Sequence, residues 1–231
     1  MNSFYSRTIL AFFIYLTATY TQANITVDKS IIDIIAGQTR RSDIYISNSG
    51  DTPQDVTLEI SQIMNPGTPD EKRVRIENPR ELGVIVTPTE FSLEPGERRK
   101  ARLSFIRIPT KEDLIYRLLV RPVTLPSSAS KKPMIQVVFN YDILVSYRPG
   151  SPDASFKVER SDRAITFTNT GNSNFLLYAG EQCESKDLNC KVIPAHRFYA
   201  GNSHRFEIEP SVGYIRFLKK DATTTEFLEY E

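Results

Sequence analysis

The chain has 231 residues, with 29 Lys and Arg against 28 Asp and Glu and a formal net charge of +1. This balance lacks the basic surplus that phosphate backbones require, so it argues against a nucleic acid as the main partner. After the N-terminal segment, no apolar run is long enough for a transmembrane helix, and the length suits one large or two small domains.

The first residues have the pattern of a secretory leader. Arg7 is basic, Ile9–Leu16 form a short apolar run, and Thr21 and Ala23 are the small residues that precede Asn24. This order predicts a signal peptide over residues 1–23, with cleavage on export. A membrane anchor or a buried strand remains an alternative reading of the same run.

Short alternating or β-branched runs dominate after residue 24. They are separated by turn signals such as Asn65-Pro66-Gly67 and Asn169-Thr170-Gly171. The pattern predicts an all-β fold, with one short helical turn over 110–114. The expected strands are Ile31–Ile35, Ser42–Ser47, Val56–Ile63, Gly83–Thr87, Ala101–Ile108, Tyr116–Val123, Ile135–Tyr147, Ala164–Thr168 and Phe175–Ala179.

A break follows the longest of these strands. Pro149 and Pro152 flank Gly150 and Ser151, and proline cannot continue a central strand. We therefore predict an N-terminal domain over residues 24–147 and a C-terminal domain over residues 148–231. The first has the length of an immunoglobulin-like sandwich, although the inter-sheet cysteine pair and tryptophan of antibody domains are absent.

Two cysteines stand close together in the second predicted domain. In an exported protein, Cys183 and Cys190 predict a disulfide that closes a small loop. Two free thiols remain an alternative. A zinc site completed by His196 and His204 is another, because zinc takes about four such ligands.

The motifs of common enzymes are missing from the sequence. It contains no GxGxxG, P-loop, HExxH or GxSxG segment. We therefore expect a protein that is not an enzyme and needs no cofactor. An exported sugar-binding or metal-binding module would predict clustered aromatic residues or ligands, whereas the Tyr and Phe residues are dispersed along the expected strands.

The expected strand Ile135–Tyr147 is unusually long. It places Ile135, Val137 and Phe139 on one face, and it lies between a polar loop over 126–133 and the predicted domain boundary. An ordinary half-buried strand has the same alternation. A long apolar strand at an exposed edge would instead pair with another chain by β-strand addition.

Several segments then match a known family in their order and spacing. They are Leu93-Glu-Pro-Gly-Glu, Leu114-Ile-Tyr-Arg-Leu-Leu-Val, Asp142-Ile-Leu-Val-Ser-Tyr-Arg-Pro and Thr168-Asn-Thr-Gly-Asn. With them the chain resembles the periplasmic chaperones of chaperone–usher pilus assembly, most of all the alternate branch that serves colonization-factor and common-pilus fimbriae. The resemblance covers nearly all residues after the leader.

This resemblance implies two immunoglobulin-like β-sandwich domains set at an angle around a short hinge. It implies a periplasmic chaperone that binds fimbrial subunits, pilins or an adhesin, by donor-strand complementation through Ile135, Val137 and Phe139. The chaperone would then deliver them to an outer-membrane usher. A self-capping homo-oligomer is expected for such an exposed strand. The alternative is a structural or adhesive fimbrial sandwich protein, against which the complete long strand and the second domain argue.

Family members also hold the carboxylate of the pilin with an arginine on the first strand and a lysine on the donor strand. In this sequence Ile32 and Leu144 occupy the matching positions. A carboxylate still needs a cation, so Arg117 is the expected replacement and Arg121 the second choice. The alternative for Arg117 is a structural ion pair with Asp142 or Asp113.

A further pair of residues matches a structural feature of the family. Arg102 and Glu112 correspond to an arginine–glutamate pair that braces the structure in those chaperones. We therefore expect both residues to be structural and to support the arrangement of the two domains.

Overall fold

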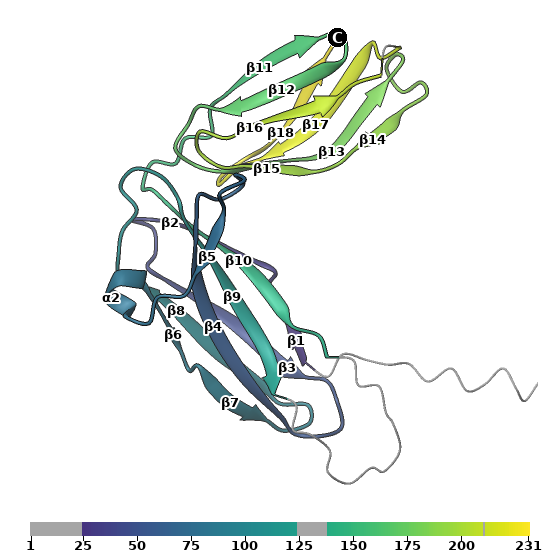
Figure 1. The fold of residues 1–231 in the computed structure, drawn as a ribbon. Helices are drawn as coiled ribbons and strands as arrows, with labels where there is room; N and C mark the ends of the chain where they lie inside the picture. Colours follow the sequence, from purple (N-terminus) through teal and green to yellow (C-terminus); the bar gives the residue numbers. More distant parts are fainter. Residues whose placement is uncertain (1–24, 124–137, 210) are drawn as a thin grey trace, which may run out of the picture.

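The computed structural model describes residues 25–123, 138–209 and 211–231, and this part of the chain consists mostly of β-strands. Figure 1 shows two β-sandwiches joined at an angle. The predicted all-β fold with two sandwich domains is confirmed. The predicted leader, residues 1–23, lies outside the described residues, and none of the described helices is long and apolar enough to cross a membrane.

Two sheets form the first sandwich. One has the order β1-β3-β8-β6, and the other has the order β2-β10-β9-β4-β5, with β7 also paired to β4. Their strands are β1 (Ile25–Val27), β2 (Ile31–Ile35), β3 (Arg41–Asn48), β4 (Gln54–Met64), β5 (Lys72–Val74), β6 (Val84–Thr87), β7 (Glu90–Leu93), β8 (Arg98–Phe105), β9 (Leu114–Val123) and β10 (Tyr141–Arg148).

Apolar side chains at alternating positions of these strands fill the core of the first sandwich. Ile44 and Ile46 of β3 face Ile143, Val145 and Tyr147 of β10 across the sandwich, and all five side chains are buried. Because successive side chains of a strand point to opposite faces, Leu144, Ser146 and Arg148 face away from this core. The outer face of β10 is therefore the face available to the second sandwich.

The second sandwich also has two sheets. Their orders are β11-β12-β16 and β14-β13-β17-β18, with β15 paired to β13. Phenylalanine side chains from several strands, among them Phe167, Phe198 and Phe217, pack in its core. The strands are β11 (Phe156–Ser161), β12 (Ala164–Asn169), β13 (Phe175–Cys183), β14 (Lys191–Ile193), β15 (His196–Phe198), β16 (Ser203–Glu207), β17 (Tyr214–Lys220) and β18 (Thr225–Tyr230).

The helical turn expected over 110–114 is wrong. The chain bends there, and Leu114 already belongs to β9. A segment this short cannot nucleate a helix against two adjoining strands whose ladders fix its ends. A short helix occurs instead at α2 (Pro79–Leu82), where the Asn78 side chain accepts a hydrogen bond from the Arg80 N–H.

The strand expected over Ile135–Tyr147 begins later in the structure than the sequence predicts. β10 begins at Tyr141 and extends to Arg148, and residues 138–140 carry no strand. These three residues lack a ladder partner on either side among the described residues. Ile135 and Val137 lie outside the described residues, so the predicted donor set is represented by Phe139.

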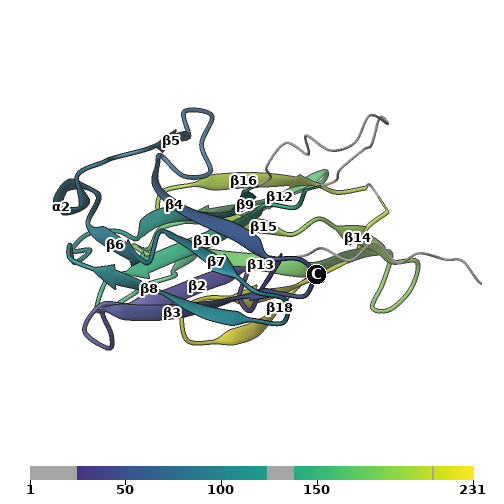
Figure 2. The ribbon, with the colours of Figure 1, turned by 90° about the horizontal axis from the view of Figure 1, so that it is seen from below.

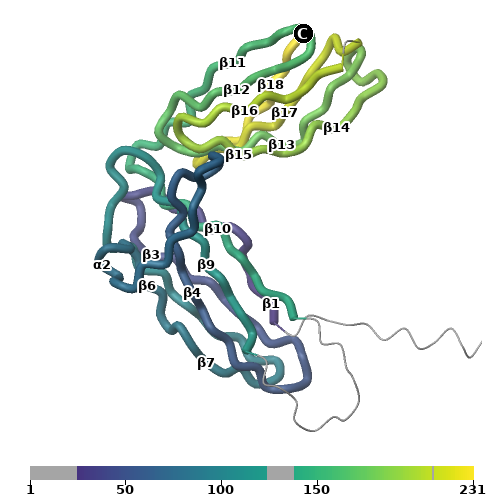
Figure 3. The backbone as a smooth tube through the Cα atoms, viewed as in Figure 1, coloured from purple at the N-terminus to yellow at the C-terminus, as the bar shows by residue number. Residues whose placement is uncertain are grey.

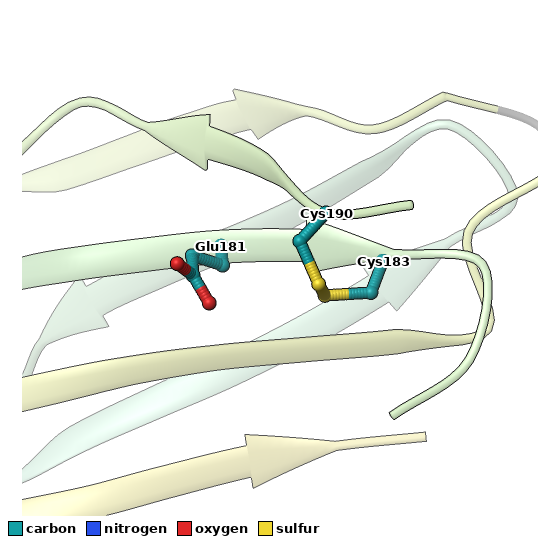
Figure 4. A group of neighbouring side chains, drawn as sticks. All are labelled: Glu181, Cys183 and Cys190. Carbon is teal, nitrogen blue, oxygen red and sulfur yellow. A yellow bond between two sulfur atoms is a disulfide. The ribbon is translucent and has the colours of Figure 1, made fainter. Parts of the chain in front are cut away.

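The predicted disulfide is confirmed. Cys183 at the end of β13 and Cys190 just before β14 are bonded, with their Cα atoms 4.1 Å apart. The two free thiols and the zinc site are thereby excluded, since both sulfur atoms are used. Figure 4 shows the Glu181 side chain beside this disulfide, and Glu181 forms an ion pair with Arg216.

Candidate functional site

A buried arginine joins the two sandwiches. The Arg148 side chain is 1% exposed, and its Nε and Nη2 donate to the two carboxylate oxygens of Asp33 at 2.5 and 2.7 Å. Its Nη1 donates to Ser173 Oγ and to the Asn174 carbonyl oxygen in the second sandwich, both at 2.6 Å. One guanidinium group therefore links β2, β10 and the segment before β13.

Asp113 completes this network from the first sandwich. Its carboxylate accepts from Ser173 Oγ at 2.8 Å and from the Asn174 N–H at 2.6 Å. Burial raises the pKa of Asp113, and the bonds from Asn174 together with the charge of Arg148 oppose that rise. Sequence patterns alone did not single out Arg148. The available signal was a single arginine at the end of an apolar strand, directly before the linker.

Leu144 lies in an apolar cluster at the same joint. It is 6% exposed and packs with Ile63 of β4, Ile115 of β9 and Tyr199 of the second sandwich. A lysine here would have to bury its ammonium group among apolar side chains. Ile32, at the position of the family arginine, points into the first core instead. Neither position offers a cation to the cleft.

The hairpin between β4 and β5 closes one side of the joint. Its tip reaches the second sandwich (Figure 3), where Asn202 Nδ2 donates to the Pro66 carbonyl oxygen at 2.7 Å. Gly67 is favoured there, because its φ of 71° lies in the left-handed region and a Cβ atom would lie 2.6 Å from Asn202 Nδ2. A cleft of about 550 Å³ remains between the sandwiches, and Glu112 and Tyr199 belong to its lining.

Arg117 is one of two arginines whose charges act on Tyr199 of the cleft lining, and the other is Arg197. Arg117 stands opposite Leu144 in the pairing of β9 with β10, and its Nη1 donates to the Asp142 carbonyl oxygen at 3.5 Å. Burial raises the pKa of Tyr199, and the charges of Arg197 and Arg117 oppose that rise.

The alternative of a structural ion pair for Arg117 is not realised among the described residues. Asp142 pairs with Arg73, and Asp113 lies in the network of Arg148. Arg121, the second candidate, is exposed and lies four residues further along β9, about 13 Å away.

The expected partnership of Arg102 and Glu112 needs correction. Arg102 lies in β8 and makes a bidentate bond to Asp43 of the neighbouring strand β3, at 2.7 and 2.8 Å. This bond lowers the pKa of Asp43 to about 2. Glu112 is exposed at the cleft. Arg148, whose strand ends at the joint, makes a contact between the two sandwiches that was expected of Arg102 and Glu112.

The start of β10 has an open edge. β2 pairs with β10 from Leu144 to Arg148, whereas β9 pairs with it from Tyr141 onward. Within the described residues, Tyr141–Ile143 thus lack a strand neighbour on the β2 side. Phe139 just precedes this edge, and the residue is 56% exposed. Unpaired backbone next to an exposed aromatic residue is a surface to which another strand can add.

The histidines lie together in the second sandwich. The rings of His196 and His204 stack with centroids 3.8 Å apart, and burial lowers the pKa of both below the ordinary 6.5. The unfolded chain therefore binds protons first as the pH falls below about 6.5. We expect the free energy of unfolding of this domain to be highest above that pH and to decrease as the pH falls below it. Urea unfolding at pH 7.5 and 5.5 measures this loss.

A His204→Gln variant provides the control for this pH dependence. It removes one titrating ring and the repulsion between two protonated rings. Its unfolding midpoint should change less between the two pH values than that of the unaltered protein. Equal changes in both proteins would contradict a role for the histidine pair.

Comparisons with known proteins agree with this geometry. The family described as pili and flagellar-assembly chaperone, PapD N-terminal domain, matches residues 24–152. A CFA/I fimbrial subunit of Escherichia coli is 29% identical over 125 residues, which is 52% of this chain and 52% of that protein. The chain thus spans about half the length of this curated relative.

Two solved structures are similar over most of the chain. The class 5 fimbriae chaperone CfaA has a TM-score of 0.65 at 21% identity, covering 90% of this chain and 99% of that one. A chain from a chaperone–tip adhesin complex of CFA/I fimbriae biogenesis has a TM-score of 0.63 at 21% identity, with 90% and 98% covered. At this identity, the two structures show a shared fold.

Proposed function

Since this chain belongs to the family of pili and flagellar-assembly chaperones, we propose that it binds fimbrial subunits in the periplasm and caps them by donating a strand. Residues 1–23 serve as the export leader, residues 24–147 bind the fimbrial partner, and residues 148–231 form the second domain. An outer-membrane usher receives the captured partner. The complex with a tip adhesin known for a protein of similar fold is consistent with this class of partner.

The open edge of β10 is the observation that carries the proposal. The backbone of Tyr141–Ile143 has no described neighbour on one side, and the exposed Phe139 precedes it. A pilin that lacks its last strand has the complementary defect, an unpaired edge beside an apolar groove. Adding Ile135, Val137 and Phe139 to that groove satisfies both defects at once.

Arg117 is the proposed anchor for the pilin carboxylate. Its guanidinium group lies beside the open edge, and the two family anchor positions, Leu144 and Ile32, supply no cation. A guanidinium group binds a carboxylate through two parallel N–H bonds. The anchor would therefore fix the register in which the donated strand enters the groove.

Replacing Arg117 with alanine is expected to weaken pilin capture by about 10- to 100-fold, because charge-assisted bonds contribute about 1.5–3 kcal/mol. The protein itself should remain folded, since Arg117 has no ion pair among the described residues. Arg121→Ala is the comparison variant, since it removes the second candidate anchor, four residues further along the same strand. Equal retention of a co-expressed pilin by the Arg117 variant and the unaltered protein would refute the anchor.

Co-purification tests the proposed function itself. The full chain is expressed with fimbrial subunits in the periplasm and isolated from that compartment, and the bound chain is identified by mass spectrometry. Recovery of a soluble one-to-one complex with a pilin supports the proposal. Aggregation of every pilin despite a folded chaperone would refute it. The free chaperone should form a dimer or tetramer if its exposed strand caps itself.

A further inference from the structure

A second arginine reaches the start of β10 from another part of the same sheet. Arg73 lies in β5 opposite Ile63, and the sheet order places β4 and β9 between β5 and β10. Arg73 Nη2 nevertheless forms an ion pair with Asp142 Oδ1. The hairpin that carries β5 projects from the first sandwich in Figure 2. Arg73 is paired with Ile63, whose side chain packs with Leu144 at the joint, so the Arg73 side chain lies on the face of the sheet that points toward the cleft.

Asp142 is thereby approached by two guanidinium groups. Arg73 contacts its carboxylate, and Arg117 donates to its carbonyl oxygen at 3.5 Å. The side chains of Arg73 and Asp142 are 42% and 45% exposed. Ion pairs at this degree of exposure are weak and readily broken. Another carboxylate can therefore replace that of Asp142 as the ion-pair partner of Arg73.

The site also lies where an incoming chain would arrive. Asp142 is part of the unpaired edge of β10, one residue from Tyr141 and two before Leu144, where pairing with β2 begins. A strand that adds to this edge brings its end to the place where β2 blocks further pairing. Two guanidinium groups at that place match the two oxygens of a terminal carboxylate.

We propose that Asp142 is a placeholder, which occupies Arg73 in the free chaperone and is replaced by the terminal carboxylate of the bound pilin. Arg73 and Arg117 then hold that carboxylate together. This inference rests on the proposed function and adds to it a second cation and an internal competitor. Exchange of one carboxylate for another leaves the number of ion pairs unchanged, so capture does not require an arginine to be freed in advance.

An Asp142→Asn variant tests the placeholder directly, because it removes the charge and keeps the shape. We expect it to bind a pilin about threefold to fivefold more tightly, the amount by which an exposed ion pair alters an equilibrium. Arg73→Gln should weaken binding by a similar factor. In the double variant, the gain from Asp142→Asn should disappear, since Arg73 is no longer there to be released.

A control variant and an altered pilin test whether the effect depends on Asp142 and on the terminal carboxylate. Glu59→Gln removes another half-exposed carboxylate from the same sheet, one that pairs with Arg75 at 3.3 Å, and should leave binding unchanged. A pilin extended at its C-terminus by Gly and Ser residues moves the carboxylate out of reach. With this extended pilin, the effects of Asp142→Asn and Arg73→Gln should both vanish.

The outcomes separate this inference from the proposed function. Dissociation constants are measured by fluorescence titration of the purified full chain, with thermal unfolding as the check that each variant is folded. Equal affinity of the Asp142→Asn variant and the unaltered protein overturns the placeholder while strand donation stands. An equal gain with the extended pilin overturns it as well. Failure of the unaltered protein to bind any pilin overturns both proposals.

Discussion

Replacing Arg148 with alanine is expected to lower the free energy of unfolding by about 3–5 kcal/mol, the usual cost of removing one partner from a buried ion pair. The loss is large because Asp113, whose side chain is 5% exposed, would keep a buried carboxylate without its cation. Ser173 Oγ and the Asn174 carbonyl oxygen would also lose a donor. Urea unfolding of the full chain, monitored by tyrosine fluorescence, measures the change.

Two further variants make this measurement diagnostic. Arg148→Lys keeps the charge but cannot bond both oxygens of Asp33 and both acceptors of the second sandwich, so it should recover part of the loss. Arg75→Ala breaks an exposed pair with Glu59 and should cost no more than about 1 kcal/mol. Similar losses for Arg148→Ala and Arg75→Ala would show that the buried network contributes little.

Replacing Phe139 with aspartate is expected to weaken pilin capture by about 10- to 100-fold, since burying a phenylalanine side chain is worth about 1.5–3 kcal/mol. A carboxylate placed in an apolar groove would add its own desolvation cost. The stability of the chaperone should hardly change, because the Phe139 side chain is exposed. Retention of a co-expressed pilin during purification measures capture.

The neighbouring residue supplies a sharp control for this experiment. Val138 is also exposed and apolar, yet it points to the opposite face of an extended chain. Val138→Asp should therefore reduce capture much less than Phe139→Asp. Equal losses would mean that general hydrophobicity, rather than alternate insertion of side chains, binds the pilin.

The strands of the first domain could be predicted because their burial alternates. The pattern of Ile44 and Ile46 is visible in the sequence, and both residues are buried in β3. The expected strands end at Ala179, so they omit β17 (Tyr214–Lys220), whose buried residues do alternate, and β18, which is less buried. β18 carries Glu226 and Glu229 and lies at a sheet edge, so its pairing with β17 is set by the neighbouring strand rather than by its own residues.

The candidate site was less predictable, because its contacts join distant parts of the chain. Arg148 bonds to Asp33 and to Ser173, which precede and follow it by many residues, and Arg73 reaches Asp142 across a sheet. Arg102 is a case in which the family resemblance indicated the wrong partner. The resemblance pairs it with Glu112, whereas in the structure its partner is Asp43. The sequence pattern of a strand indicates which face of the sheet each side chain occupies. The ion pairs between distant residues depend instead on how the strands and the two sandwiches are arranged in space.

A single strand, β10, connects the open edge of the first sandwich with the joint between the two sandwiches. β10 begins at the open edge by Tyr141 and ends at Arg148, inside the joint between the sandwiches, a length of about 25 Å. A paired strand is stiff along its axis, so a pilin bound at one end, as we propose, would be held at a fixed orientation to the second sandwich at the other. Any tilt of the second sandwich that β10 follows would then change the orientation of the captured pilin.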